Sequence, residues 1–135
     1  MPEPVRTDEP ETAEEACSLA TVRRVAALLD LAPERFREGD RLPRGWHFFL
    51  FAPAPPQAAL GPDGWLPPPE GLGLERPRLL HGGRRMEWQG DLAIGQRLRR
   101  SSRTVLQPPS EGRSGLLVRA LRRHEIADAA DGRPL

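Results

Sequence analysis

Hydrophobic and aromatic residues gather in one short stretch, Leu42–Pro53, which reads LPRGWHFFLFAP. Six consecutive residues from Trp46 onward are apolar or aromatic apart from His47. Periodicity does not separate a buried helix from a buried strand in so short a run. Pro43 suits the first turn of a helix, where its missing N–H costs nothing, and Pro53 prevents continuation. We therefore predict a short buried helix at the centre of the core, with a sheet wrapped around it.

The residues before this stretch predict a strand followed by a helix. Residues 1–11 are acidic and rich in proline, so we expect a flexible tail there and a folded domain over residues 12–135. Thr12–Cys17 is expected to form a short edge strand, and Ser18 is a good N-cap for the helix behind it. Pro33 is expected to end that helix. Its apolar residues recur at i, i+3, i+4 and i+7 and form one stripe: Val22, Val25, Ala26 and Leu29.

Residues 53–80 show no regular pattern and are rich in proline. The motif GPDG at Gly61–Gly64 predicts a turn, because each of these residue types favours turn positions. We expect Trp65 and Leu66 to attach this long connection to the body of the protein. A disordered linker is the alternative, and connections of this length are often functional.

After Gly82 and Gly83 the hydrophobic period changes to two. Met86–Trp88 predicts a short strand, and Arg97–Leu106 and Leu116–Ile126 predict two long strands joined as an antiparallel hairpin. On the first long strand, Leu98 and Thr104 share one face and Arg97, Arg99 and Arg103 the other. The core face of the second carries Leu116, Val118, Ala120 and Ile126. Helices followed by antiparallel strands with one wet face indicate an α+β fold.

Composition narrows the function classes. The chain has 135 residues with 38% hydrophobic residues, which suits one domain with a single core. The net charge of +1 is too balanced to require a polyanionic partner, although all 20 basic residues are arginine. Cys17 is the single cysteine, so no internal disulfide forms, and we expect a small buried hydrophobe in a reducing compartment. No signal peptide and no run of roughly 18 apolar residues is visible, so we expect a cytoplasmic protein without a membrane anchor.

Five short motifs together resemble a known family. They are LPRGWHFFLF from Leu42, LGPDG at Leu60–Gly64, HGGRRMEW at His81–Trp88, EGRSGLLV at Glu111–Val118 and RHEI at Arg123–Ile126. In this order and spacing the chain resembles the N-terminal half of the MaoC-like acyl-CoA hydratases and dehydratases, and the mesaconyl-CoA hydratase-like group in particular. The resemblance implies a hot-dog fold, in which an antiparallel sheet wraps a central helix. The chain ends where that fold has its last strand, so we expect an incomplete domain, either a fragment or a split subunit.

The resemblance also implies a reaction, the reversible addition of water to an enoyl thioester. In this family the Asp (or Asn) and His that carry acid–base chemistry lie in the C-terminal hot-dog half. We therefore expect a substrate-side half with no catalytic residue of its own. Its partners would be an acyl-CoA thioester, which is substrate and not cofactor, and a second hot-dog domain or subunit. The alternative is a stand-alone hot-dog module that binds acyl-CoA or dimerises without enzymatic activity.

Four residues are candidates for binding substrate. They are Trp46 and His47 at the start of the predicted central helix, and Gly82 and Gly83, where a backbone without side chains allows close approach of a ligand. Each has a plain structural alternative: a hydrogen-bonded His at a helix start for His47, and an ordinary turn beside His81 for the glycines.

The sequence gives little indication of a metal site or of a nucleic-acid-binding surface. His124, in RHEI, is expected to be a satisfied core or interface histidine. The three histidines have no short ligand spacing and there is no second cysteine, so we expect no metal site. The arginines of the two long strands suggest nucleic acid, but few aromatic residues interleave with them as stacking platforms. These arginines are Arg97, Arg99, Arg100, Arg103, Arg122 and Arg123, and CoA phosphates are better partners for a few of them.

Overall fold

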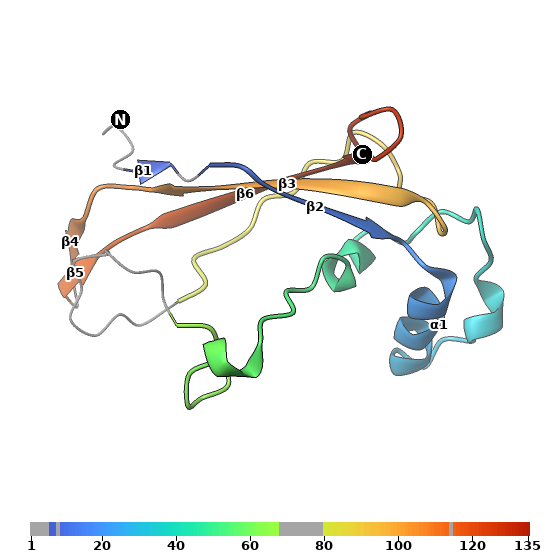
Figure 1. Ribbon diagram of the computed structural model, residues 1–135, viewed down its shortest axis with the longest axis horizontal. Helices are drawn as coiled ribbons and strands as arrows, with labels where there is room; N and C mark the ends of the chain where they lie inside the picture. The colour runs from blue at the N-terminus through green and yellow to red at the C-terminus, as the bar shows by residue number, and fades with distance from the viewer. Residues whose placement is uncertain (1–5, 8, 68–79, 114) are drawn as a thin grey trace.

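One long antiparallel sheet runs through the molecule (Figure 1). The structure is a computed structural model that describes residues 6–7, 9–67, 80–113 and 115–135. The central strand is β3 (Arg97–Leu106). β6 (Ala120–Asp128) pairs along one edge of β3, and β1 (Arg6–Thr7) and β2 (Glu11–Ala16) follow one another along the opposite edge. The α+β class predicted from the sequence is confirmed by this sheet and the helix that follows β2.

One face of the sheet is buried at β3 and the other is exposed, as the alternation of apolar and polar residues predicts. Leu98 is fully buried and Ser102 is 2% exposed, whereas Arg97, Arg99 and Arg103 point to solvent. On the outer face Arg97 and Arg99 both form ion pairs with Glu14 of β2, at 3.2 and 2.9 Å. We call the face that carries Leu98 and Ser102 the inner face.

A single α-helix, α1 (Leu19–Leu28), follows β2 directly. Ser18 is its N-cap as predicted, and its hydroxyl accepts a hydrogen bond from the Thr21 backbone N–H at 3.2 Å. Val22 and Ala26 are fully buried, but Leu29 is 52% exposed because it lies beyond the last helical turn. The helix ends before the proline that was expected to stop it, since Asp30 adopts a left-handed conformation with φ 55°.

Pro33 instead opens the short 3-10 helix η1 (Pro33–Arg35).

The prediction of a buried central helix over Leu42–Pro53 is wrong. The stretch contains only one 3-10 turn, η2 (Trp46–Phe49). Gly45 precedes it with φ 94° and Phe51 follows it with φ 58°, so neither flank continues a helix. The hydrophobic prediction behind it holds in part, because Leu50 and Phe51 are buried at 4% and 7% exposure while Trp46 and Phe49 are half-buried.

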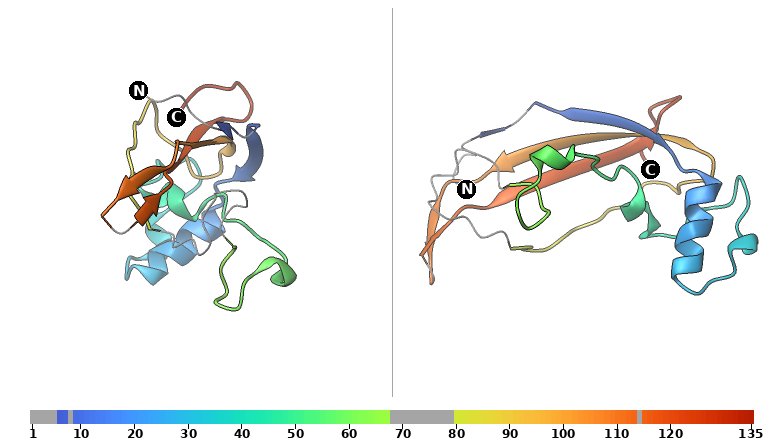
Figure 2. Two further views of the ribbon diagram at one scale, coloured as in Figure 1. Left: turned by 90° about the vertical axis from the view of Figure 1, so that its left-hand side faces the viewer. Right: turned by 60° about the horizontal axis from the view of Figure 1, so that its bottom comes forward.

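The helix α1 does not replace the predicted central helix, because it does not lie against the middle of the sheet. Figures 1 and 2 show it at one end of the sheet, beside the start of β3, and not along the length of the sheet. Within the described residues, the inner face toward the far ends of β3 and β6 therefore has no α-helix against it.

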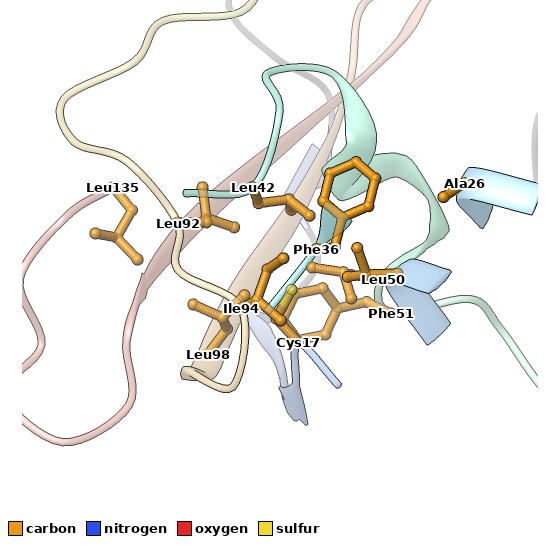
Figure 3. Close-up of a cluster of buried hydrophobic side chains, with 11 residues drawn as sticks. Cys17, Ala26, Phe36, Leu42, Leu50, Phe51, Leu92, Ile94, Leu98 and Leu135 are labelled. Atoms are coloured by element: carbon orange, nitrogen blue, oxygen red, sulfur yellow. The ribbon is translucent and has the colours of Figure 1, made fainter. Parts of the chain in front are cut away.

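The hydrophobic core lies where β2, α1 and the start of β3 meet (Figure 3). Backbone hydrogen bonds join Leu42 to Leu92 (2.7 Å) and Ile94 to Asp40 (2.8 Å), which brings two loops into this core. Cys17 is fully buried there, and burial raises its pKa to about 11, so it behaves as the small hydrophobe that the sequence predicts. The buried apolar set is Cys17, Val22, Ala26, Phe36, Leu42, Leu50, Phe51, Leu92, Ile94, Leu98 and Leu135.

The remaining segments correct several further predictions. Met86–Trp88 is extended but forms no strand. The last predicted strand, Leu116–Ile126, is divided: β5 (Gly115–Leu117) pairs with β4 (Ser110–Gly112) in a small hairpin, and β6 begins only at Ala120. Leu116 is 51% exposed and Ala120 is exposed as well, so of the four residues predicted to share the core face Ile126 is the one that packs against the core.

The predicted GPDG turn is present. The Gly64 N–H donates to the Gly61 carbonyl at 2.9 Å, after the short 3-10 helix η3 (Gln57–Ala59). Trp65 is 75% exposed and Leu66 is 48% exposed, so these side chains do not attach the connection to the body as expected. The rest of that connection, residues 68–79, lies outside the described residues. No helix in the described part of the chain is long and apolar enough to cross a membrane.

The assignment of faces predicts unequal costs for two leucine truncations. Leu98→Ala is expected to lower the free energy of unfolding by about 2–5 kcal/mol, because its side chain is fully buried in the core. Leu121→Ala, on the outer face of β6 and 61% exposed, is the matched control and should change it by less than about 0.5 kcal/mol. Denaturant titration measures both, and equal losses would show that the faces are wrongly assigned.

Candidate functional site

The turn η2 and the extended segment 84–88 form a cluster of aromatic and arginine side chains. The His47 ring meets Trp88 edge-on, with centroids 5.0 Å apart, and lies 4.3 Å from the Phe48 ring. The Arg84 guanidinium lies 4.3 Å above Phe48, and that of Arg44 lies 5.4 Å from Trp88. We call these five residues the His47 cluster. The side chains of the cluster are held together by aromatic and cation–π contacts.

The surroundings of the His47 ring disfavour its charged form. Burial lowers its pKa below the ordinary value of 6.5, and the nearby charge of Arg84 lowers it further. Its Nδ1 atom is buried and has no hydrogen-bond partner within the described structure. The structural alternative for this residue was a hydrogen-bonded imidazole at a helix start, and the observed ring instead packs edge-on against Trp88 and leaves Nδ1 unpaired. A buried ring nitrogen without a partner costs free energy of folding, because its hydrogen bond to water is lost and not replaced.

The other three candidate residues, Trp46, Gly82 and Gly83, do not take part in the His47 cluster. The Trp46 ring lies 5.2 Å from Phe36 and 6.3 Å from Phe49, and it packs against the core. Gly82 and Gly83 are exposed, and no described heavy atom lies within 4 Å of a Cβ built on either residue. His81, beside them, is exposed as well. In the sequence, Gly82 and Gly83 directly precede Arg84, which is a member of the His47 cluster.

A second polar group lies on the inner face of the sheet, and the sequence did not single it out as a site. The β3–β6 register sets Ser102 opposite His124, and the Ser102 hydroxyl lies 2.8 Å from His124 Nδ1. Burial lowers the pKa of His124, as do the neighbouring charges of Arg100, Arg122 and Arg84, while Glu11 opposes them. The sequence signal was present, since the alternation from Leu98 places Ser102 on the buried side of β3.

Arg100 also lies on the inner face, two residues after Leu98 on β3. Its Nη1 donates to the Phe51 carbonyl at 3.1 Å, and its guanidinium lies 5.0 Å from the Phe51 ring. Glu15 of β2 accepts a hydrogen bond from the Phe51 N–H. The side chains of Glu15 and Arg100 thus hold Phe51, the last residue of the aromatic stretch, against the sheet. The Arg100 Nε atom is buried without a partner among the described residues.

The described residues hold no pair suited to general acid–base catalysis. Neither His47 nor His124 is hydrogen-bonded or ion-paired to a carboxylate there, and such a partner usually orients a catalytic imidazole. No group of three or more His, Cys, Asp or Glu side chains in the described segments is arranged to hold a metal ion.

Comparison with known proteins relates the chain distantly to an acyl-CoA hydratase of the MaoC-like class. That relative is the mesaconyl-C(4)-CoA hydratase of Chloroflexus aurantiacus, which is 33% identical over 116 residues. The matched region covers 80% of this chain but only 39% of the relative's length. No family model matches the chain. The resemblance read from the motifs is therefore supported as a distant and partial similarity.

The lowered histidine pKa values predict how stability depends on pH. Below the ordinary pKa of 6.5 the unfolded chain binds protons more readily than the folded chain at His47 and His124, so stability falls as pH decreases. We expect the free energy of unfolding to fall between pH 7.5 and pH 5.5, and to fall less in the double variant His47→Gln/His124→Gln. Denaturant titration across this range measures the slope.

The matched control for this experiment is His81→Gln, which removes an exposed imidazole. A double variant that keeps the full slope of the natural chain, or a control that reduces the slope as much, would contradict the prediction.

Proposed function

We propose that the chain is the substrate-side half of an enoyl-CoA hydratase or 3-hydroxyacyl thioester dehydratase, built as a MaoC-like hot-dog domain. In this proposal it helps to enclose the acyl thioester, while a second hot-dog half supplies the catalytic acid and base. The observation that carries it is the extent of the similarity: most of this chain matches a hydratase, yet the match spans only 39% of that enzyme's length.

The architecture agrees with such a role. A sheet whose inner face is only partly covered leaves space for an acyl group or for an element of a partner domain. The core occupies the end of the sheet near α1, and among the described residues no α-helix covers the inner face beyond Ser102.

The chemistry of the site agrees with binding better than with catalysis. Hydration requires a group that activates water and another that protonates the α-carbon, both held within hydrogen-bond reach. In this chain His124 is engaged with Ser102, and His47 packs against Trp88. In our proposal Gly82 and Gly83 contribute exposed backbone to substrate binding, His47 and its aromatic neighbours line the same side, and Trp46 supports η2 from the core side.

The second hot-dog half would meet this chain along the free edge of β6. β6 pairs with β3 on one side, while along its other edge the described residues provide only the bridge between Ala127 and Pro134. The N–H and C=O groups that such an edge leaves open are suited to pairing with a strand of another domain. The alternative function, a stand-alone module that binds acyl-CoA or dimerises, could use the same edge. An activity measurement is therefore needed to distinguish a hydratase half from such a module.

Turnover measurements test the proposal. The isolated chain is expected not to hydrate crotonyl-CoA or mesaconyl-C(4)-CoA above background, measured as loss of enoyl-thioester absorbance, because in the described structure neither His47 nor His124 is paired with a carboxylate. Activity should appear when a C-terminal hot-dog half is supplied, in the same chain or as a second one. The corresponding half of the Chloroflexus relative provides a concrete partner.

The outcomes separate the competing assignments. Robust turnover by the isolated chain that His47→Ala abolishes would make His47 catalytic and overturn the proposal. A reconstituted complex that binds CoA thioesters but never turns over would support the stand-alone module instead.

A further inference from the structure

The free edge of β6 is occupied at one end, and this end determines how the rest of the edge can be paired. After a turn the chain comes back beside β6, and Pro134 forms an antiparallel bridge to it. The Asp128 N–H donates to the Arg133 carbonyl at 2.9 Å, and the Leu135 N–H donates to the Ile126 carbonyl at 3.1 Å. Pro134 lies between these two hydrogen bonds, at a position where its missing N–H costs nothing.

The returning segment 133–135 is anchored in the core by Leu135. The side chain of Leu135 is 9% exposed and belongs to the buried apolar set. A Cβ built on Gly90 would lie 3.3 Å from the Leu135 Cδ2 atom, so the two residues pack closely. The register places Leu135 opposite Ile126, and both side chains therefore lie on the inner face. The segment thus runs antiparallel to β6 in one fixed register.

Beyond Ile126 this edge of β6 has no strand against it within the described structure. Successive residues of a strand direct their backbone N–H and C=O groups to alternate edges. The Ile126 carbonyl faces the free edge, so the backbone groups of His124, Arg122 and Ala120 face it as well. Residues 120–125 are therefore an open edge that continues the line of residues 133–135.

A second copy of β6 is a poor partner for this open edge. In a symmetric antiparallel pair, the residues whose N–H groups face the edge lie opposite one another. The register that pairs residues 120–124 with their own copy places Arg122 opposite Arg122, and a shift by two residues places Arg123 opposite Arg123. Like charges directly opposite one another destabilise a strand pair. Each arginine has a carboxylate in its own chain, but such exposed ion pairs contribute little.

We propose that residues 120–125 of β6 are a binding site for an extended strand of a partner polypeptide. The strand runs antiparallel to β6 in the register of residues 133–135, and it carries acidic or neutral side chains opposite Arg122 and Arg123. That this strand belongs to the second hot-dog half rests on the proposed function. The strand site itself does not, because it depends on hydrogen bonds and charges within this chain.

A strand appended to the chain tests the site, because an attached strand has a high effective concentration. The extension TVEVTV, placed directly after Leu135, sets glutamate opposite Arg123 and its two flanking valines opposite His124 and Arg122. Amide hydrogen exchange is followed residue by residue by NMR. We expect exchange at His124 and Arg122 to slow by about tenfold or more, because their N–H groups become hydrogen-bonded. Exchange at Arg123 and Leu121, whose N–H groups face β3, should change less.

The matched control is the extension TPEPTV, because proline cannot donate at the two positions opposite Arg122 and His124. It should leave both amides in fast exchange, and the extension TVRVTV should protect them less than TVEVTV does. The site is overturned if TVEVTV gives no protection, or if TPEPTV protects equally. Equal protection by TVRVTV would overturn the preference for an acidic or neutral strand.

The unextended chain distinguishes a partner strand from a second copy. Protection of the Arg122 and His124 amides that increases with the concentration of this chain alone would assign the edge to a second copy and overturn the proposal. Exchange that stays fast at every concentration is the expected result. Because no turnover is involved, a failed hydratase assay would leave the strand site standing, and a failed exchange experiment would leave the hydratase assay standing.

Discussion

The attachment of Phe51 to the sheet is the interaction on which the rest of the structure depends. Its N–H donates to Glu15 of β2 and its carbonyl accepts from Arg100 of β3, so both backbone groups of a buried residue are satisfied by side chains. This matters because Phe51 has φ 58°, a conformation that is unfavourable for a large side chain. The two charged partners hold it there, and the chain leaves the core directly after Phe51.

This attachment also decides where the aromatic residues go. Because the chain reverses at Phe51 and is left-handed at Gly45, the four residues between Gly45 and Leu50 form a single turn with two sides. Trp46 faces Phe36 and the core, while His47 and Phe48 face Trp88 and Arg84. A continuous helix would have distributed these side chains around one axis. The single turn instead directs Trp46 to Phe36 and His47 to Trp88, and both tryptophans pack against the core.

The inner face of the sheet is divided in the same way. Near α1 it is apolar and packed around Leu98, and beyond Arg100 it becomes polar, with Ser102, His124 and Arg122 in register. The inner face therefore changes from apolar to polar within the length of β3.

The sequence alone determined the features that depend on local pattern. Alternation defined β3 and its two faces, Ser18 marked the start of α1, and the short motifs indicated the relationship to the hydratases. Tertiary structure decided the rest. The run after Trp46 is hydrophobic enough for a helix, but the left-handed residues on both sides and the side chains of Glu15 and Arg100 limit it to one turn. Arg100 and Ser102 gained their roles only through the register with neighbouring strands, because contacts between residues distant in sequence are not encoded in any local period.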